Sequence, residues 1–351
     1  MILFRVDGNP DIGMGHIMRC LSIADVWREQ KESCLFAVAD DYFSDVIQAH
    51  GHKVFFLNTD YRDMLSDLDI MNEFIKKQKP LVLFTDSYQV SYIYMNELWE
   101  TCKTVNCKLI YIDDFLAFAY PCDILLNYNI YGLDKKNEYR KLYHEKNIMC
   151  PHLLLGTRYA PLRAEFRCIE KRKVKKYAYS ILILTGGSDP DHIAKRFVRY
   201  IVENSAKLPD LYFHFVIGVM NYDRSEIEKL AEQNSCIILH YNVQHMRQLM
   251  YSVDLAISAA GFTLYELCAT QTPTITYILA DNQVLGAKKF DEERILCCVG
   301  DARKLGEELI KILLEEAIKL AENYKKRVKI AENQRLIVDG NGAERIIKEI
   351  Y

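Results

Sequence analysis

The chain has 351 residues, of which 50% are hydrophobic and 26% charged, and its 45 Lys and Arg face 48 Asp and Glu for a net charge of −3. A domain commonly takes roughly 100–200 residues, so this length predicts two domains with a core each. The composition excludes disordered and collagen-like chains. The balanced charge excludes a global basic field for nucleic acid or anionic lipid, so a local site must recognise any partner.

No targeting or membrane-spanning segment is expected. The opening MILFRVDGNP lacks the apolar stretch of a secretory signal, and no run approaches the roughly 20 apolar residues of a membrane span. The 11 cysteines form no CxxC pair, which predicts buried free thiols in a reducing cytoplasm. The 9 histidines are scattered and none pairs with Cys at ligand spacing, so no metal is expected.

The first half alternates apolar runs with amphipathic windows. The run ILFRVD is followed by a glycine-containing loop and then a helical window in which Ile17, Leu21, Ala24 and Trp27 share one face. The runs CLFAVAD, KVFFLN, LVLFTDS and KLIYIDD are apolar at consecutive positions, which predicts buried strands of a parallel sheet, and DILLNYN closes this half. The β-α order predicts an α/β domain over residues 1–166.

The alternation of predicted strands and helices stops over residues 143–176, where the proline-containing PHLLLGTRYAPLRAEF precedes the basic run RCIEKRKVKKY. We expect a hinge at residues 167–177. Strands and helices resume with SILILTGGSDP, LYFHFVIGV, CIILHY, DLAISAAG and PTITYIL, which predicts a second parallel-sheet domain over residues 178–351. The charged segment 302–337 reads as one or two helices on the outside of that domain.

A glycine-rich turn follows the first predicted strand and ends in Gly13, Gly15 and His16. Its glycines let the backbone approach a ligand, and the following helix offers free N–H groups to an anion. The turn lacks the third glycine of a dinucleotide-binding fingerprint. His16 stands where parallel sheets bind ligands, and the helix N-terminus favours the neutral imidazole that a general base needs. A helix cap or packed turn residue is the alternative role for His16.

The second glycine turn, LTGGSDP, opens the second domain. Gly187 and Ser188 form a candidate phosphate cradle after a strand, while a tight turn with an Asp-Pro helix start explains the same residues.

The third turn is AAGFTLYE, where Gly261 precedes a helix whose first turns carry Thr263 and Glu266. One interpretation is a capping box of Thr263 with Glu266. The other is a helix N-terminus that takes a diphosphate while Glu266 reaches a ribose. The ADNQ segment with Asn282 and Gln283 repeats the arrangement one βα unit later, with amides suited to phosphate or sugar oxygens.

These blocks resemble a known family. RVDGNPDIGMGHIMRCLSIA, LVLFTDSY, LIYIDD, LLGTRYAPLRAEF, LILTGGSDP and DLAISAAGFTLYELCATQTPTITYILADNQ occur in the same order in the UDP-2,4-diacetamido-2,4,6-trideoxy-β-L-altropyranose hydrolases of pseudaminic acid biosynthesis. The later block is also similar to the N-acetylglucosaminyltransferase that makes lipid II. The resemblance covers residues 2 to about 290 and implies the GT-B fold, with two Rossmann-like parallel-sheet domains that face a cleft.

The resemblance also implies a reaction and its residues. A UDP-sugar would be hydrolysed at the anomeric carbon with inversion, without a cofactor, with UDP on the second domain and the sugar facing the first. His16 matches the proposed general base, Asn282 and Gln283 match diphosphate contacts, and Glu266 matches a ribose-binding residue. Tyr88 matches a sugar- or phosphate-side tyrosine. Other enzymes of nonulosonic acid biosynthesis are candidate partners.

The predicted chemistry requires few protein groups. UDP is a good leaving group, so the two carboxylates of ordinary glycosidases are unnecessary, and backbone N–H groups can stabilise the diphosphate. Asp86, Asp113 and Asp114 end first-domain strands, and either orient His16, the water or the sugar, or form turns.

One position departs from the family's pattern. Phe262 stands where relatives carry a serine, which removes a hydroxyl and adds bulk at the expected nucleotide contact. Two alternatives stay open: a GT-B glycosyltransferase that passes the sugar to an acceptor, and a non-catalytic nucleotide-sugar binder, for which Phe262 is the only indication. The run KNEYRKLYHEK is expected to be a solvated helix face rather than a membrane-facing patch.

Overall fold

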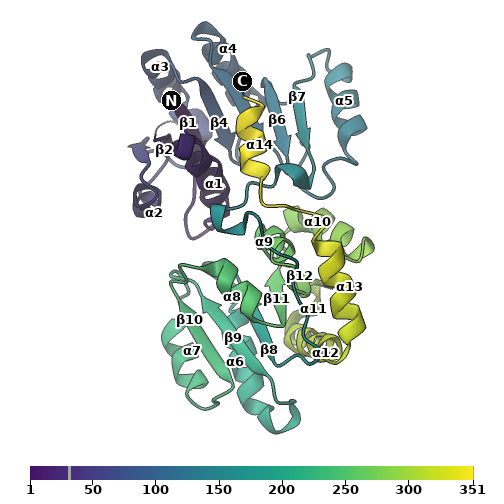
Figure 1. Ribbon diagram of the computed structural model, residues 1–351. Coiled ribbons are helices and arrows are strands. Elements are labelled where there is room, and N and C mark those ends of the chain that lie inside the picture. Colours follow the sequence, from purple (N-terminus) through teal and green to yellow (C-terminus); the bar gives the residue numbers. More distant parts are fainter. Residues whose placement is uncertain (31–32, 351) are drawn as a thin grey trace. The chain divides into compact units, whose positions relative to one another are not determined.

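The computed structural model describes residues 1–30 and 33–350 and divides into two compact units. Unit 1 comprises Met1–Ala164 and Gly340–Tyr351, and unit 2 comprises Glu165–Asp339. Each unit is a parallel β-sheet with helices on both faces (Figure 1). Parallel strands need crossover connections, and the alternation of strands with helices in the sequence supplies them.

Unit 1 contains a seven-stranded sheet of order β3-β2-β1-β4-β5-β6-β7. Its strands are β1 (Ile2–Val6), β2 (Leu35–Val38), β3 (Lys53–Phe56), β4 (Val82–Asp86), β5 (Lys108–Ile112), β6 (Ile124–Asn127) and β7 (His152–Leu155). Its helices are α1 (Gly15–Gln30), α2 (Ser44–Ala49), α3 (Leu68–Gln78), α4 (Tyr92–Thr104), α5 (Lys136–Glu145) and α14 (Gly342–Lys348).

Both faces of this sheet are apolar, as the consecutive hydrophobic positions predict. One face packs against α3, α4 and α5 in a core that includes Leu83 and Leu98. On β1, Phe4 stacks between the rings of Phe36 and Phe84, with 4.8 Å between centroids in each pair. The predicted apolar stripe of α1 is confirmed, since all four of its residues are buried.

Unit 2 contains a six-stranded sheet of order β10-β9-β8-β11-β12-β13. Its strands are β8 (Ser180–Leu184), β9 (Tyr212–Ile217), β10 (Ile237–Tyr241), β11 (Leu255–Ala259), β12 (Thr274–Ile278) and β13 (Cys297–Asp301). Its helices are α6 (Ile193–Glu203), α7 (Arg224–Ala231), α8 (Met246–Ser252), α9 (Thr263–Ala269), α10 (Asp281–Glu292), α11 (Ala302–Leu305), α12 (Leu309–Glu322) and α13 (Tyr324–Gln334). The core on one face joins the sheet to α6 and α12.

The structure corrects four details of the sequence analysis. The run KVFFLN forms edge strand β3, which is partly exposed rather than buried on both sides. Residues 143–176, where no strand was predicted, contain strand β7. Helix α12 is not an outer helix, because Leu309, Leu313 and Ala317 are buried in the unit 2 core. Residues 340–351 were expected in the second domain but belong to unit 1, where α14 packs beside α1 (Figure 1).

The hinge expected at residues 167–177 is not the boundary between the units, because these residues lie within unit 2. The chain passes between the units after Ala164 and again after Asp339. The physical reason is Arg172, whose buried guanidinium donates hydrogen bonds to main-chain carbonyls of unit 2 and to the Thr272 hydroxyl.

The cysteine prediction is confirmed in part: all 11 thiols are free, but only six are buried, while four are partly exposed and Cys168 is exposed. The expected solvated helix is α5, where only Tyr139 and Tyr143 are buried. Within the described ranges, no helix combines the length and apolar character that crossing a bilayer requires.

Candidate active site

The glycine turn after β1 is folded by the side chain of Asn9. Its amide oxygen accepts hydrogen bonds from the main-chain N–H groups of Asp11 and Ile12 at 3.0 and 3.1 Å, and its carbonyl accepts from Gly13 at 2.7 Å. Gly13 has φ +72°, a left-handed conformation that glycine adopts without a steric penalty. The turn therefore starts α1 at Gly15 and sets His16 on its first turn.

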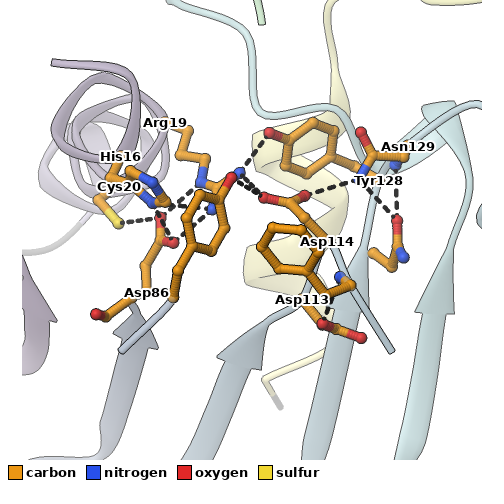
Figure 2. Close-up of polar contacts among 12 residues, drawn as sticks. His16, Arg19, Cys20, Asp86, Asp113, Asp114, Tyr128 and Asn129 are labelled. Carbon is orange, nitrogen blue, oxygen red and sulfur yellow. Dashed lines mark hydrogen bonds and ion pairs between the residues drawn. The ribbon is translucent and has the colours of Figure 1, made fainter. Parts of the chain in front are cut away.

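His16 is buried against the end of the neighbouring strand. β1 pairs with β4 in a register that puts Val6 opposite Asp86, so the Asp86 carboxylate lies beside the start of α1. His16 Nδ1 is 2.7 Å from Asp86 Oδ1 (Figure 2). A carboxylate only accepts, so this contact requires a hydrogen on Nδ1 and leaves Nε2 the lone pair that can take a proton. Arg19 Nη2 also lies 3.1 Å from Nδ1, and with this tautomer it donates to Asp86 Oδ1 rather than to the ring.

Arg19 lies one turn after His16 on the same helix face. Its Nε donates to Asp86 Oδ2 at 2.6 Å, and its Nη1 donates to Asp114 Oδ2 at 2.9 Å and to the Tyr128 hydroxyl at 2.7 Å. The guanidinium thus bridges the carboxylates of Asp86, the last residue of β4, and Asp114, which follows β5 (Figure 2). Burial would raise the pKa of Asp86, but Arg19 and His16 outweigh it and hold that pKa well below its ordinary value. Asp86 therefore stays ionised at neutral pH.

Tyr88 packs its ring edge-on against His16, with 4.5 Å between ring centroids and an angle of 77°. Its hydroxyl donates to Asp114 Oδ2 at 2.7 Å. Burial and then the Asp114 charge raise the pKa of Tyr88, so it remains a protonated donor. Asn129 donates to the other oxygen of Asp114 at 2.7 Å. The Asp114 carboxylate thus accepts from three side chains, Arg19, Tyr88 and Asn129.

Asp113 has the turn role that was the alternative for all three aspartates. Its carboxylate accepts from the N–H groups of Phe115 and Leu116 and from the Tyr139 hydroxyl. The three aspartates therefore divide: Asp86 contacts His16, Asp114 contacts Tyr88 and Arg19, and Asp113 closes a turn.

No sequence pattern predicted a role for Arg19, Tyr128 or Asn129. Arg19 has a local signal, because its spacing of three residues from His16 puts both on one helix face. Tyr128 and Asn129 have none, since only the order of strands in the sheet brings the segment after β6 to this place.

In unit 2, the predicted site residues follow three adjacent strands. Gly187 and Ser188 follow β8, Gly261 follows β11, and Asn282 follows β12. The carboxyl ends of parallel strands meet at one edge, where α/β proteins bind ligands. The structure therefore gathers His16, Gly13, Gly15 and Tyr88 at the edge of one sheet. It gathers Gly187, Ser188, Gly261, Thr263, Glu266, Asn282 and Gln283 at the corresponding edge of the other.

The turn after β8 is exposed at Gly187, while Asp189 closes the helix behind it. The Asp189 carboxylate accepts from the N–H groups of Ile193 and Ala194, both at 2.9 Å. The N-terminus of α6 is thus occupied by a residue of the chain, as the helix-start alternative predicted. Burial raises the pKa of Asp189 to about 6.

The proposed capping box at α9 does not form. The N-cap is Phe262, which makes no side-chain capping bond, and Thr263 is the first helical residue. Glu266 is buried, at 6% exposure. In the next unit, the Gln283 side chain accepts from Leu279 N–H at 2.8 Å, which folds it back toward the end of β12.

Within the part of the chain that the structure describes, no group of three or more His, Cys, Asp or Glu could hold a metal ion.

Fold and sequence comparisons define the class. The protein has the GT-B fold, and residues 181–346 match the Glycosyltransferase family 28 C-terminal domain. MurG of Acinetobacter baumannii aligns with a TM-score of 0.63 and 12% identity over 99% of this chain and 98% of its own. The UDP complex of MnaA from S. aureus aligns with a TM-score of 0.66 and 11% identity over 99% and 95%.

Sequence relatives confirm the resemblance drawn from the motifs. The uncharacterized protein MJ1062 of Methanocaldococcus jannaschii is 29% identical over 81% of this chain, which spans 56% of that relative's length. The spore coat polysaccharide biosynthesis protein SpsG of Bacillus subtilis is 23% identical over 98% of this chain and 97% of its own. The UDP-2,4-diacetamido-2,4,6-trideoxy-beta-L-altropyranose hydrolase of Campylobacter jejuni is 27% identical over 74% and 85%. The chain is a distant homologue of these hydrolases and of SpsG.

Proposed function

We propose that the protein is a nucleotide-sugar hydrolase that cleaves a UDP-linked 2,4-diacetamido-2,4,6-trideoxyhexose into UDP and the free sugar. The observation that carries the proposal is the buried His16–Asp86 pair, 2.7 Å apart, at the ligand-binding edge of a parallel sheet. The homology to hydrolases of this substrate supports the sugar class. The product would enter the synthesis of nonulosonic acids for surface or spore-coat glycans.

His16 acts as the general base in this proposal. Nε2 takes a proton from water, the hydroxyl attacks the anomeric carbon, and the bond from that carbon to the UDP oxygen breaks with inversion. The oxygen keeps the electron pair and leaves with UDP. Asp86 stabilises the imidazolium that forms, because its carboxylate accepts the Nδ1 hydrogen bond in both protonation states of the ring.

Arg19 and Tyr88 are positioning residues. Arg19 holds both oxygens of Asp86, so the carboxylate keeps its orientation toward His16. Tyr88 restrains the His16 ring from one side. Since the Tyr88 hydroxyl already donates to Asp114, the leaving UDP departs without protonation by Tyr88.

The UDP half of the substrate is assigned to unit 2. The turns that carry Gly187, Gly261 and Thr263 would offer main-chain N–H groups to the diphosphate. Asn282 would contact the diphosphate and Glu266 the ribose, as the resemblance implies, along with Ser188 and Gln283.

The experiment is a UDP-release assay on UDP-2,4-diacetamido-2,4,6-trideoxy-β-L-altropyranose without any acceptor. We expect wild type to release UDP and His16→Gln to lose roughly 10²–10⁴-fold in kcat, the scale of a general base. His144→Gln, which alters an exposed histidine of α5, is the control and should keep full activity. NMR of the first sugar anomer formed tests inversion.

Three outcomes would contradict the proposal. UDP release only in the presence of an acceptor would establish a glycosyltransferase. UDP binding without release from any UDP-sugar would establish a binder. Full activity of His16→Gln would remove the general base.

A further inference from the structure

Unit 2 carries a cluster of cations away from the candidate site. We call this cluster the basic surface, and it consists of Lys171, Lys173, Lys176, Lys325, Lys329 and Arg335, all exposed. The first three precede β8, and the others lie on or just after α13. Two grooves of about 700 and 390 Å³ cross it, and Tyr324 lines both, so the surface is continuous.

The cations of the basic surface are not neutralised. Some exposed lysines elsewhere pair with a carboxylate of their own helix, as Lys103 does with Glu100 and Lys319 with Glu316, both at 2.8 Å. Across residues 1–30 and 33–350, no member of the basic surface forms such an ion pair. Three carboxylates line its grooves, those of Asp210, Glu322 and Glu332, against five of the six cations, since Lys325 lines neither groove. The surface therefore concentrates positive charge on a chain whose net charge is −3.

Two buried arginines hold the basic surface in shape. Arg172 donates to main-chain carbonyls and a threonine hydroxyl, and Arg327 donates to the carbonyls of Lys175 and Lys176, both at 3.0 Å. The carboxylate that acts on both arginines is Asp254, which also pairs with Lys175 at 3.1 Å. The arginines thus tie the segment before β8 to α13 and add positive charge beneath the surface.

Large apolar side chains stand among these cations. Leu336 is 83% exposed next to Arg335, and Tyr177 and Tyr179 are 61% and 55% exposed next to Lys176. Lysines attract anionic headgroups, while leucine and tyrosine insert at the boundary between headgroups and acyl chains. A soluble phosphate would need donors that converge on one point, whereas these cations are spread over two grooves.

We propose that the basic surface binds the phosphate headgroups of an anionic phospholipid membrane, with Leu336 and the tyrosines at the interface. The protein would then work at the membrane surface without crossing it. This inference does not depend on the proposed reaction, because its readout is lipid binding.

The test is sedimentation of the full chain with vesicles of phosphatidylcholine alone or mixed with phosphatidylglycerol. We expect binding to the mixed vesicles only, weakened as salt concentration rises. The variant with Lys325→Gln, Lys329→Gln and Arg335→Gln should bind roughly 100-fold more weakly, at about fivefold per cation. Leu336→Ser should weaken binding about fivefold and leave its salt dependence unchanged.

The matched control replaces three paired lysines, Lys103, Lys135 and Lys319, by glutamine and should bind as wild type does. Melting temperature and UDP release should be unchanged in every variant, which separates lipid binding from folding and from the proposed reaction. Absence of binding to the mixed vesicles overturns the proposal, as does equal binding to neutral vesicles or an equal loss in the control. Binding of inorganic pyrophosphate or a single-stranded oligonucleotide in place of vesicles also overturns it.

Discussion

Replacement of Asp86 by asparagine tests the centre of the candidate site with minimal change in shape. Both carboxylate oxygens accept from Arg19, and Oδ1 also accepts from His16. An amide in either orientation sets its N–H against an N–H of Arg19. In one orientation the asparagine N–H also faces Nδ1 of His16, which must then accept. The ring hydrogen moves to Nε2, and the lone pair that takes the proton from water is lost.

We expect kcat/KM to fall roughly 10²–10⁴-fold, which is about 3–5 kcal/mol of transition-state stabilisation. The free energy of unfolding should fall by about 3 kcal/mol, because a buried charge pair is broken. Arg19 limits this loss, since it keeps its contacts to Asp114 and Tyr128.

The assay is UDP release under saturating and limiting substrate, with UDP affinity measured by calorimetry. The matched control is Asp67→Asn, which breaks another buried aspartate–arginine pair of unit 1 that involves Arg5 and lies outside the candidate site. The control should lose stability yet keep its kcat/KM. If folded Asp86→Asn keeps kcat/KM within about threefold of wild type, the argument that this pair activates His16 fails.

Three further predictions concern other parts of the chain. Tyr88→Phe keeps the ring against His16 but loses the hydrogen bond to Asp114, so kcat/KM should fall only about tenfold and less than in Tyr88→Ala; equal losses would contradict the role of the ring. The raised pKa of Asp189, about 6, gives a stability contribution that is present below about pH 4 and lost as the pH rises through 6. The free energy of unfolding of Asp189→Asn, measured with urea, should therefore rise by about 3 kcal/mol relative to that of wild type between pH 4 and 7. If the two proteins change equally with pH, this prediction is refuted. In Gly342→Ala the added Cβ would lie 2.1 Å from the Ala160 carbonyl oxygen, so unit 1 should lose about 2–3 kcal/mol. Hydrogen exchange should speed up in α1 and stay unchanged in α6.

The central strands of both sheets were predictable because they are buried on both faces. Runs such as LVLFTD and SILIL need no partner to be recognised, since consecutive apolar residues suit only a strand covered on both sides. The same rule failed for β3, because position at the edge of a sheet leaves a strand exposed whatever its composition. Helix α14 was placed in the wrong domain because its contacts lie far away in the sequence, on α1.

The sequence by itself determined the class of fold, the glycine turn after β1, and the position of His16 at the start of the helix that follows this turn. These properties are local: apolar periodicity, the conformational freedom of Gly13, and the start of a helix. The tertiary structure decided which groups act on His16. Asp86 lies beside it because β4 pairs with β1 rather than with β3, its predecessor in the sequence. Strand order in a parallel sheet depends on how the crossover helices pack, and no local pattern records it.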